Sequence, residues 1–505
     1  MKILVKRTHI EIHNYELGDS ERLEYFFTIY DKLTHQFYYK GLDYIPNKKI
    51  LLLPRGLDIY YLENLFGEKA EYDESYDKFG YFNQTLIRYM PRDNIQKEAL
   101  RFMLGKGEYS VTSDKSQLSI NLNTGAGKTY VAIASIVYFA AKAIVIASSV
   151  EWLRQWKKCL LEYTDMKTNE IVMMNGLVSI IKLINGIGKN SINTTKVYLV
   201  THSTLRNYGE KYGWNAITVL FKNLQVGIKI YDEAHLNFEN ITKIDYHTST
   251  YKNYYLTATP ARSNEDENDI YKLYFKNIMG IDLFNEDTDP RTKYVAIKYT
   301  SCPTPKEIES CKNQYGLDRN RYTDYVVKKE NFYLLLHILM DMINKVCGKV
   351  LIYIGTNSAI LTVYEWLIQT YPEYANDIGV FTSVVKDNKK DQLSKRIILS
   401  TTKSAGAAVD IKDLKMIIVL AEPFKSEVLA RQTLGRTRDR NTLYIDIVDM
   451  GFSYCNTFYK KKKPIFSKYA LECSEITLGV DELVEKASAI IDRRSKPLKK
   501  VITRL

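Results

Sequence analysis

The stretch INLNTGAGKTYVAI, residues 120–133, constrains the fold more than any other part of the chain. It passes from an apolar strand pattern through a turn with two glycines into an apolar helix pattern. Gly125 and Gly127 permit backbone conformations and close approaches that other residues resist. A helix that begins at such a turn directs its N-terminal amides at an anion. The stretch therefore predicts a phosphate-binding loop in which Lys128 reaches the β and γ phosphates and Thr129 offers its hydroxyl to magnesium.

Leu122 departs from the standard Gly-x4-Gly-Lys-Ser/Thr form of such a loop, which has a glycine at this position. The other residues expected to surround the phosphates are Thr124, Gly125, Ala126 and Gly127. The alternative is a glycine turn at a strand–helix junction that binds no nucleotide. The rest of the chain distinguishes these two possibilities.

The stretch VGIKIYDEAH, residues 226–235, is an apolar strand pattern that ends in two acids. Nucleotide hydrolysis needs a carboxylate for magnesium and a group that orients the attacking water. We expect Asp232 to hold magnesium through water and Glu233 to polarise the nucleophile. About a hundred residues separate this stretch from Lys128, which leaves room for intervening strands. Both are therefore expected at the carboxyl edge of one sheet.

Apolar strand patterns alternate with helical stretches twice along the chain. Such alternation predicts parallel βαβ units in a doubly wound sheet. The expected fold class is α/β, with parallel-sheet domains at 86–292 and 293–455, a small N-terminal α+β domain at 1–85 and a basic C-terminal extension at 456–505. The predicted strands are 118–122, 143–147, 196–200, 227–231 and 253–257 in the first half, and 349–354, 378–381, 396–400, 416–420 and 442–448 in the second.

The two ends of the chain carry weaker patterns. Residues 2–13 alternate like a strand, 21–33 read as an amphipathic helix, and a Pro-Arg-Gly turn leads to a helix that ends at Gly67. Residues 69–84 are polar and predict a linker, and 458–466 predict an exposed turn.

The net charge of the 505 residues is +12, and the C-terminal end carries half of it. From Lys460 to Leu505, twelve Lys and Arg minus six Asp and Glu leave +6. A basic surplus favours a polyanionic partner such as nucleic acid or an anionic membrane, and a solvated tail without a partner is the alternative. Residues 131–150 are mostly apolar, but Lys142 interrupts them, so they predict a buried helix and strand and not a membrane span.

The six cysteines contain no C-x-x-C pair, and the seven histidines are scattered. This pattern indicates neither a zinc site nor a disulfide framework. The N-terminus also lacks the continuous apolar stretch of a signal peptide. We therefore expect a cytoplasmic location, which would be the host cytoplasm if the protein is viral.

Four motifs, in this order along the chain, resemble those of superfamily 2 helicases and translocases. LNTGAGKT, YDEAH, LTATP at 256–260 and QTLGR at 432–436 are similar to motifs I, II, III and VI. Many members of that superfamily have no glycine at the first position of motif I, so Leu122 favours this resemblance. The resemblance implies two RecA-like domains with ATP and Mg²⁺ bound between them.

Further segments match the same superfamily. Residues 91–100 are similar to a segment that reads adenine, in which Gln96 would bond the base edge, although Arg92 lies one residue farther away than usual. Segments 146–156, 197–205, 349–360 and 396–420 resemble motifs that contact nucleic acid. The residues expected to make those contacts are Ser148, Thr201, Thr356 and Thr401, with Thr402 as the alternative to Thr401.

The remaining nucleotide contacts implied by the resemblance come from the second half. Gly406 would allow a close backbone approach, and Asp410 would lie near the nucleotide. Motif VI usually reads Gln-x-x-Gly-Arg-x-x-Arg; here Gln432 and Arg436 match, but Asp439 stands at the last position. We expect Arg436 to reach the γ-phosphate. The second arginine is Arg438 or Arg440, and the sequence leaves both open.

The function these motifs favour is that of an ATP-dependent DNA helicase or translocase acting on branched or double-stranded DNA in replication, recombination or repair. The layout of residues 1–85 resembles that of tailed-phage branch-migration helicases of the UvsW type, with a possible DNA-binding role. The alternatives are a translocase that moves on duplex DNA without separating strands, an RNA helicase, and a nucleic-acid-binding structural protein without catalysis.

Overall fold

The protein is described from a computed structural model in which residues 1–31, 36–83, 85–122, 126–185, 193–257, 265–283, 292–314, 316–382, 385, 389–405, 411–424, 427–434 and 441–495 are the described part of the chain. The chain divides into two compact units, Met1–Asn285 and Glu286–Leu505. The predicted boundary at 292/293 lies within ten residues of this division.

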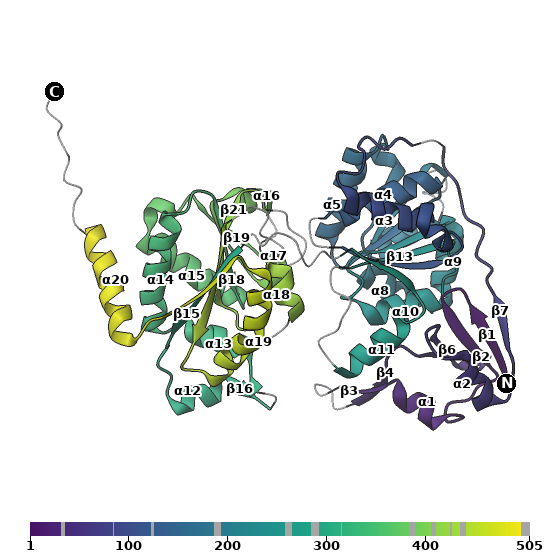
Figure 1. The fold of residues 1–505 in the computed structure, drawn as a ribbon, viewed down its shortest axis with the longest axis horizontal. Helices are drawn as coiled ribbons and strands as arrows, with labels where there is room; N and C mark the ends of the chain where they lie inside the picture. Colours follow the sequence, from purple (N-terminus) through teal and green to yellow (C-terminus); the bar gives the residue numbers. More distant parts are fainter. Residues whose placement is uncertain are drawn as a thin grey trace. The chain divides into compact units, whose positions relative to one another are not determined.

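A parallel sheet that includes β13 forms the centre of the first unit (Figure 1). It has seven strands, in the order β10-β11-β9-β12-β13-β8-β14. Its strands are β8 Gln117–Asn121, β9 Ala143–Ala147, β10 Ile171–Met174, β11 Val197–Thr201, β12 Ile228–Tyr231, β13 Lys252–Thr257 and β14 Met279–Asp282. The helices are α3 Asn94–Leu104, α4 Lys128–Phe139, α5 Val150–Tyr163, α6 Leu177–Ile184, α8 His202–Tyr212, α9 Asn215–Leu224, α10 Phe238–Tyr246 and α11 Glu265–Phe275. All five predicted strands are confirmed to within two residues, and the predicted apolar segment 131–150 falls in α4 and β9.

A second, smaller sheet lies in the N-terminal part of the first unit, in the order β5-β6-β2-β1-β7. Its elements are β1 Lys2–Lys6, β2 His9–His13, β5 Asp43–Ile45, β6 Ile50–Pro54 and β7 Ala70–Asp73, with α1 Glu21–Phe26, α2 Ile59–Phe66 and the separate hairpin β3 Thr28–Asp31 and β4 Gln36–Tyr39. The predicted helix ending at Gly67 is confirmed, since Gly67 caps α2 in the left-handed conformation at φ 67°.

Three predictions for this region are wrong. Residues 2–13 do not form one strand, because they fold into the antiparallel pair β1 and β2. Residues 21–33 do not form one helix, because α1 ends at Phe26 and the β-branched and aromatic residues that follow form strand β3. Residues 69–84 are not all linker, because Ala70–Asp73 pairs in parallel with β1. A salt bridge of 2.6 Å between Lys6 Nζ and Asp73 Oδ2 lies on this pairing.

The small sheet and the large sheet share one hydrophobic core, which includes Ile3 and Ile10 as well as Tyr231 and Tyr255. The turn at Gly56 approaches the large domain so closely that an added Cβ would lie 1.7 Å from the Leu273 carbonyl oxygen. The N-terminal part is therefore packed into the first unit, where the sequence predicted a separate domain at 1–85.

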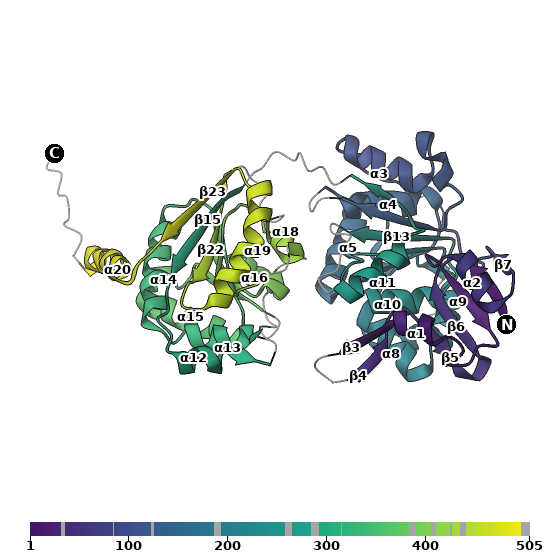
Figure 2. The ribbon, with the colours of Figure 1, turned by 60° about the horizontal axis from the view of Figure 1, so that its bottom comes forward.

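A second seven-stranded parallel sheet forms the centre of the second unit, in the order β19-β20-β18-β21-β22-β15-β23 (Figure 2). Its strands are β15 Thr292–Tyr299, β18 Lys349–Ile354, β19 Ile378–Phe381, β20 Ile397–Ser400, β21 Leu414–Ala421, β22 Thr442–Asp449 and β23 Glu472–Thr477. The helices are α12 Pro305–Ser310, α13 Arg319–Val326, α14 Glu330–Asn344, α15 Asn357–Thr370, α16 Lys389–Ser394, α17 Thr402–Ala405, α18 Glu427–Leu434, α19 Ser453–Tyr469 and α20 Val480–Ser495. The short hairpin β16 Lys312–Asn313 and β17 Gly316–Leu317 completes the unit.

Alternate residues of these strands face opposite layers of helices. Val350 and Ile352 of β18 belong to the core formed with α13, α14 and α15, whereas Leu351 and Tyr353 belong to the core formed with α18 and α19. The two helical layers explain why the strands read as continuous apolar runs. The α/β fold class with two parallel-sheet domains is thus confirmed.

The described part of the predicted extension at 456–505, which ends at residue 495, contains regular secondary structure. The predicted exposed turn at 458–466 lies within helix α19, and β23 pairs in parallel with β15 at the edge of the sheet. The helix continues through Pro464, and Phe466 stacks on Tyr294 at a centroid distance of 4.1 Å. Lys462 is buried and contacts Asp446 at 2.8 Å, so part of the basic charge there serves packing. Within the described residues, no helix is long and apolar enough to cross a membrane.

Candidate functional site

The loop between β8 and α4 contains the first group of predicted residues. Gly127 caps α4 with φ 95°, a conformation that favours glycine, and Lys128 is the first residue of the helix. The side chain of Leu122 is buried, its N–H donates to the Thr257 carbonyl at 3.1 Å, and its carbonyl accepts from Lys128 Nζ at 3.3 Å. Leu122 thus packs in the core while its backbone holds the lysine. Thr124 and Gly125 lie outside the described residues, and Ala126 and Thr129 are partly buried.

The predicted acidic pair follows strand β12 directly. Lys128 Nζ lies 3.3 Å from Glu233 Oε1, and the two side chains are only 10% and 15% exposed. Strand β13 separates β12 from β8 in the sheet, and the parallel arrangement brings both carboxyl ends to one edge. Glu233 has φ 51°, a left-handed conformation that is uncommon outside glycine. Lys128 and Glu233 thus meet as the sequence predicted.

Asp232 is partly buried next to Glu233. Burial raises the pKa of Asp232, and the neighbouring charge of Glu233 raises it further. The indole N–H of Trp156 opposes this rise by donating to Asp232 Oδ2 at 2.7 Å. A cation placed beside this carboxylate would relieve the repulsion between the two acids.

Within the described residues, no three His, Cys, Asp or Glu side chains are grouped as a metal cage. Magnesium is usually held by one or two carboxylates together with substrate phosphates, so a full protein cage is not required. The hard oxygen donors of Asp232 and Thr129, in a loop of the phosphate-binding type, fit such an ion.

The acidic loop is also bound to strand β13, whose end carries the LTATP stretch. The Ala234 N–H donates to the Leu256 carbonyl at 2.9 Å, and His235 Nδ1 lies 3.0 Å from Thr257 Oγ1. A displacement of the acidic loop would therefore shift the end of β13 or break these two contacts. Residues 258–260 lie outside the described part of the chain.

Gln96 is buried on helix α3 and contacts the phosphate loop. Its Nε2 donates to the Ala126 carbonyl at 3.0 Å, and its Oε1 accepts from the Arg92 N–H at 2.8 Å. A Cβ added at Gly127 would lie 2.1 Å from Gln96 Nε2, so this contact requires a glycine. The sequence predicted a contact to the base and did not anticipate this link to the loop.

The predicted nucleic-acid residues all lie where a strand passes into a helix. Thr201 and Thr356 are the N-caps of α8 and α15, and Thr401 Oγ1 accepts from the Ser404 N–H at 3.0 Å before α17. Ser148 precedes α5 and accepts from Asn237 Nδ2 at 2.7 Å. Thr201 is buried, so its hydroxyl serves the helix cap. These positions share a geometry that presents helix N-termini to an anion.

The second-unit nucleotide candidates are mostly outside the described residues. Gly406, Asp410, Arg436, Arg438 and Arg440 belong to that group. Gln432 lies on helix α18, and its side chain is not described.

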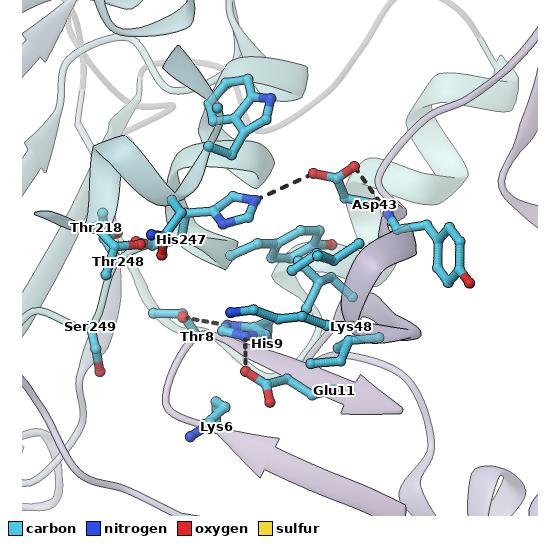
Figure 3. A pocket seen from close by; sticks show the side chains of 18 of the residues that line it. Lys6, Thr8, His9, Glu11, Asp43, Lys48, Thr218, His247, Thr248 and Ser249 are labelled. Carbon is cyan, nitrogen blue, oxygen red and sulfur yellow. Dashed lines mark hydrogen bonds and ion pairs between the residues drawn. The ribbon is translucent and has the colours of Figure 1, made fainter. Parts of the chain in front are cut away.

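Two features were missed by sequence reasoning. Trp156 gave no signal as a partner of Asp232, because an indole within an amphipathic helix reads as a core residue. A hollow of about 760 Å³ lies between the small sheet and helices α9 and α10 (Figure 3). His9 contacts Glu11 at 3.2 Å on its floor, and His247 contacts Asp43 at 3.5 Å. Burial lowers the pKa of His9.

Comparisons with known proteins agree with this geometry. Residues 89–262 match the family model of the type III restriction enzyme, res subunit. The DNA 3'-5' helicase XPB of Mycobacterium tuberculosis is 28% identical over 152 residues, which are 30% of this chain and 25% of that protein. The chain thus matches about a quarter of this relative's length.

Solved structures match over most of the chain. Dbp5 of S. cerevisiae, bound to RNA and ADP BeF3, covers 79% of this chain and 92% of that one at 13% identity, with a TM-score of 0.51. At 13% identity this likeness concerns the fold alone. T4 UvsW covers 95% of this chain and 100% of its own, but at 15% identity and a TM-score of 0.35. That score does not support a closer kinship, so the UvsW-type layout stays a prediction.

Proposed function

We propose that this chain is an ATP-dependent DNA helicase or translocase of superfamily 2. The contact between Lys128 and Glu233 supports the proposal most directly, because it brings the phosphate-loop lysine and the water-polarising acid to one buried site. Lys128 would bind the β and γ phosphates, and Gln96 the adenine. Thr129 and Asp232 would hold Mg²⁺, which would neutralise charge on the phosphates as hydrolysis proceeds.

Within the first unit, the chemistry assigned to these residues follows from their surroundings. Glu233 would take a proton from the attacking water, and its contact with Lys128 would break when the lysine turns to phosphate. The bonds from the acidic loop to Leu256 and Thr257 would pass this change to the end of β13. Arg436, Asp410 and Gly406, with Gln432 and Arg438 or Arg440, would complete the nucleotide contacts as the sequence predicts.

We propose DNA as the polymer because the curated relative XPB is named a DNA helicase. The Dbp5 structure contains RNA, and this observation keeps an RNA helicase as a second candidate. Ser148, Thr201, Thr356 and Thr401 would lie near phosphates, so binding would depend on salt and little on base sequence. A duplex translocase without strand separation uses the same engine and remains the third candidate.

ATP hydrolysis measured side by side with single-stranded DNA, duplex DNA, four-way junctions and RNA tests the proposal, together with a strand-separation assay. We expect stimulation by DNA, strongest for branched or duplex forms. Stimulation by RNA alone would replace the DNA assignment. Absence of hydrolysis with every polymer would favour a binding protein without catalysis.

A further inference from the structure

Helix α5 contacts the candidate nucleotide site through Trp156. The indole N–H donates to Asp232 Oδ2 at 2.7 Å, and the Trp156 side chain is 2% exposed. A hydrogen bond to a charged acceptor is about twice as strong as one between neutral groups. Because the indole is rigid and buried, it fixes the direction in which the Asp232 carboxylate points.

The segment that leads into α5 contacts the same acidic loop a second time. Asn237 follows the loop and occupies the N-cap position of α10, and its Nδ2 donates to Ser148 Oγ at 2.7 Å. The stretch from Asp232 to Asn237 is therefore bound to the α5 segment at both ends. A displacement of α5 cannot leave the acidic loop in place unless one of these bonds breaks.

We propose that Trp156 is a positioning residue that orients Asp232 for Mg-nucleotide and makes α5 the element through which strand binding near Ser148 reaches the nucleotide site. This inference rests on the proposed ATPase function and adds a residue to it. When a strand phosphate binds near Ser148, the start of α5 moves with it, and Trp156 carries the movement to the Asp232 carboxylate.

Trp156→Phe tests the proposal, since it keeps an aromatic side chain and removes the N–H donor. Trp152→Phe is the matched control: Trp152 lies one turn earlier on α5 and is also buried. We expect Trp156→Phe to weaken binding of a fluorescent ATP analogue in Mg²⁺ by roughly 10- to 100-fold, as is typical when a partner of a metal ligand is lost. Binding in EDTA should stay within about twofold of wild type, because the phosphate loop is untouched.

A spectroscopic measurement isolates the indole itself. The chain has four tryptophans, so replacing Trp152, Trp214 and Trp366 with Phe leaves Trp156 as the only one. We expect Mg-nucleotide, but not nucleotide in EDTA, to shift its emission. Adding DNA before nucleotide should shift that emission as well.

The outcomes separate this inference from the proposed function. Wild-type protein that binds no Mg-nucleotide would reject the proposed function and the inference with it. Normal wild-type binding with equal losses in both single variants, or with losses in Mg²⁺ and EDTA alike, would assign Trp156 to packing and overturn the inference alone. Unchanged binding by Trp156→Phe, or a silent Trp156 emission, would do the same.

Discussion

Lys128 Nζ lies 3.3 Å from Glu233 Oε1, in a site from which most water is excluded. The lysine and the acid therefore balance each other until phosphate competes for the lysine. Lys128→Ala removes the phosphate contact, and Glu233→Gln removes the base while keeping its size. We expect either change to lower ATP hydrolysis by at least about 100-fold. Nucleic-acid binding, measured by fluorescence anisotropy, should persist.

Glu239→Gln serves as a control for that experiment. Glu239 lies on α10, where it pairs with Lys243 at 3.9 Å on the surface. Hydrolysis by this variant should match wild type. Undiminished hydrolysis by Lys128→Ala or Glu233→Gln would reject the assignment of the site.

Asp245 should carry much of the stability of the first unit. It pairs with Lys229 at 2.5 Å, and neither side chain is exposed. The hydroxyls of Tyr231, Tyr255 and Tyr274 donate to its two oxygens. Asp245→Asn would leave the Lys229 charge buried without a counter-ion, so we expect a loss of about 3–5 kcal/mol.

Hydrogen exchange at strands β12 and β13 measures this loss in the full chain. The exposed pair of Glu239 and Lys243 provides the comparison, because such pairs contribute about 1 kcal/mol or less. Equal protection in Asp245→Asn and Glu239→Gln would contradict the assignment.

His202 should make the first unit sensitive to acid. It stacks on Tyr231, it is buried, and neither ring nitrogen has a hydrogen-bond partner among the described residues. Burial lowers the pKa of His202 from 6.5 to about 3. Between pH 6.5 and about pH 3, His202 is protonated in the unfolded chain but neutral in the folded chain. The free energy of unfolding therefore falls as the pH falls below 6.5.

The expected size of that effect is about 1.4 kcal/mol per pH unit, or about 2 kcal/mol between pH 6.5 and 5. His202→Phe keeps an aromatic ring and should abolish this contribution. Denaturation curves of both proteins at several pH values measure the difference. Parallel pH profiles for the two proteins would show that His202 does not titrate in this way.

Gln96 contacts both Ala126 and Arg92, and the predicted base contact would use the remaining hydrogen-bonding capacity of its amide. We expect Gln96→Ala to raise the KM for ATP about tenfold, as loss of about 1.4 kcal/mol would, and to weaken the preference for ATP over GTP. Steady-state kinetics with both nucleotides measures this. An equal rise in KM for ATP and GTP would show that Gln96 only supports the phosphate loop and does not contact the base.

Most of the inner strands could be predicted because they are buried on both faces and read as apolar runs. Strand β15 was not predicted, since Lys293 and Lys298 interrupt its apolar residues. The edge strand β23 could not be predicted either, since all six of its residues are exposed and its acids pair with lysines such as Lys293 and Lys298. Helix α19 was not predicted because it contains Pro464, a residue that usually breaks a helix. The stacking of Phe466 on Tyr294 offsets the destabilisation of the helix by this proline. Both β23 and α19 are stabilised by contacts with β15, which lies more than 150 residues earlier in the sequence.

In the candidate site, too, some residues could be predicted from local sequence, whereas others depend on how the helices pack. Lys128, Asp232 and Glu233 follow from local motifs, because each motif ends a strand of one parallel sheet. The bond from Trp156 to Asp232 depends on how α5 is rotated on that sheet, which no local pattern specifies. The link from Gln96 to Ala126 depends likewise on where α3 lies.

The close approach of Gly56 to Leu273 has a practical consequence for anyone who redesigns this protein. Residues 1–85 do not form an independent module that can be deleted or transferred to another protein. A chain shortened to begin at residue 86 would expose apolar residues of α10 and α11 to water, because Gly41 and Gly56 pack closely against Ile270 and Leu273, and the Tyr246 hydroxyl donates to the Gly41 carbonyl. Any division of labour between these parts must be sought by point substitution within the intact chain.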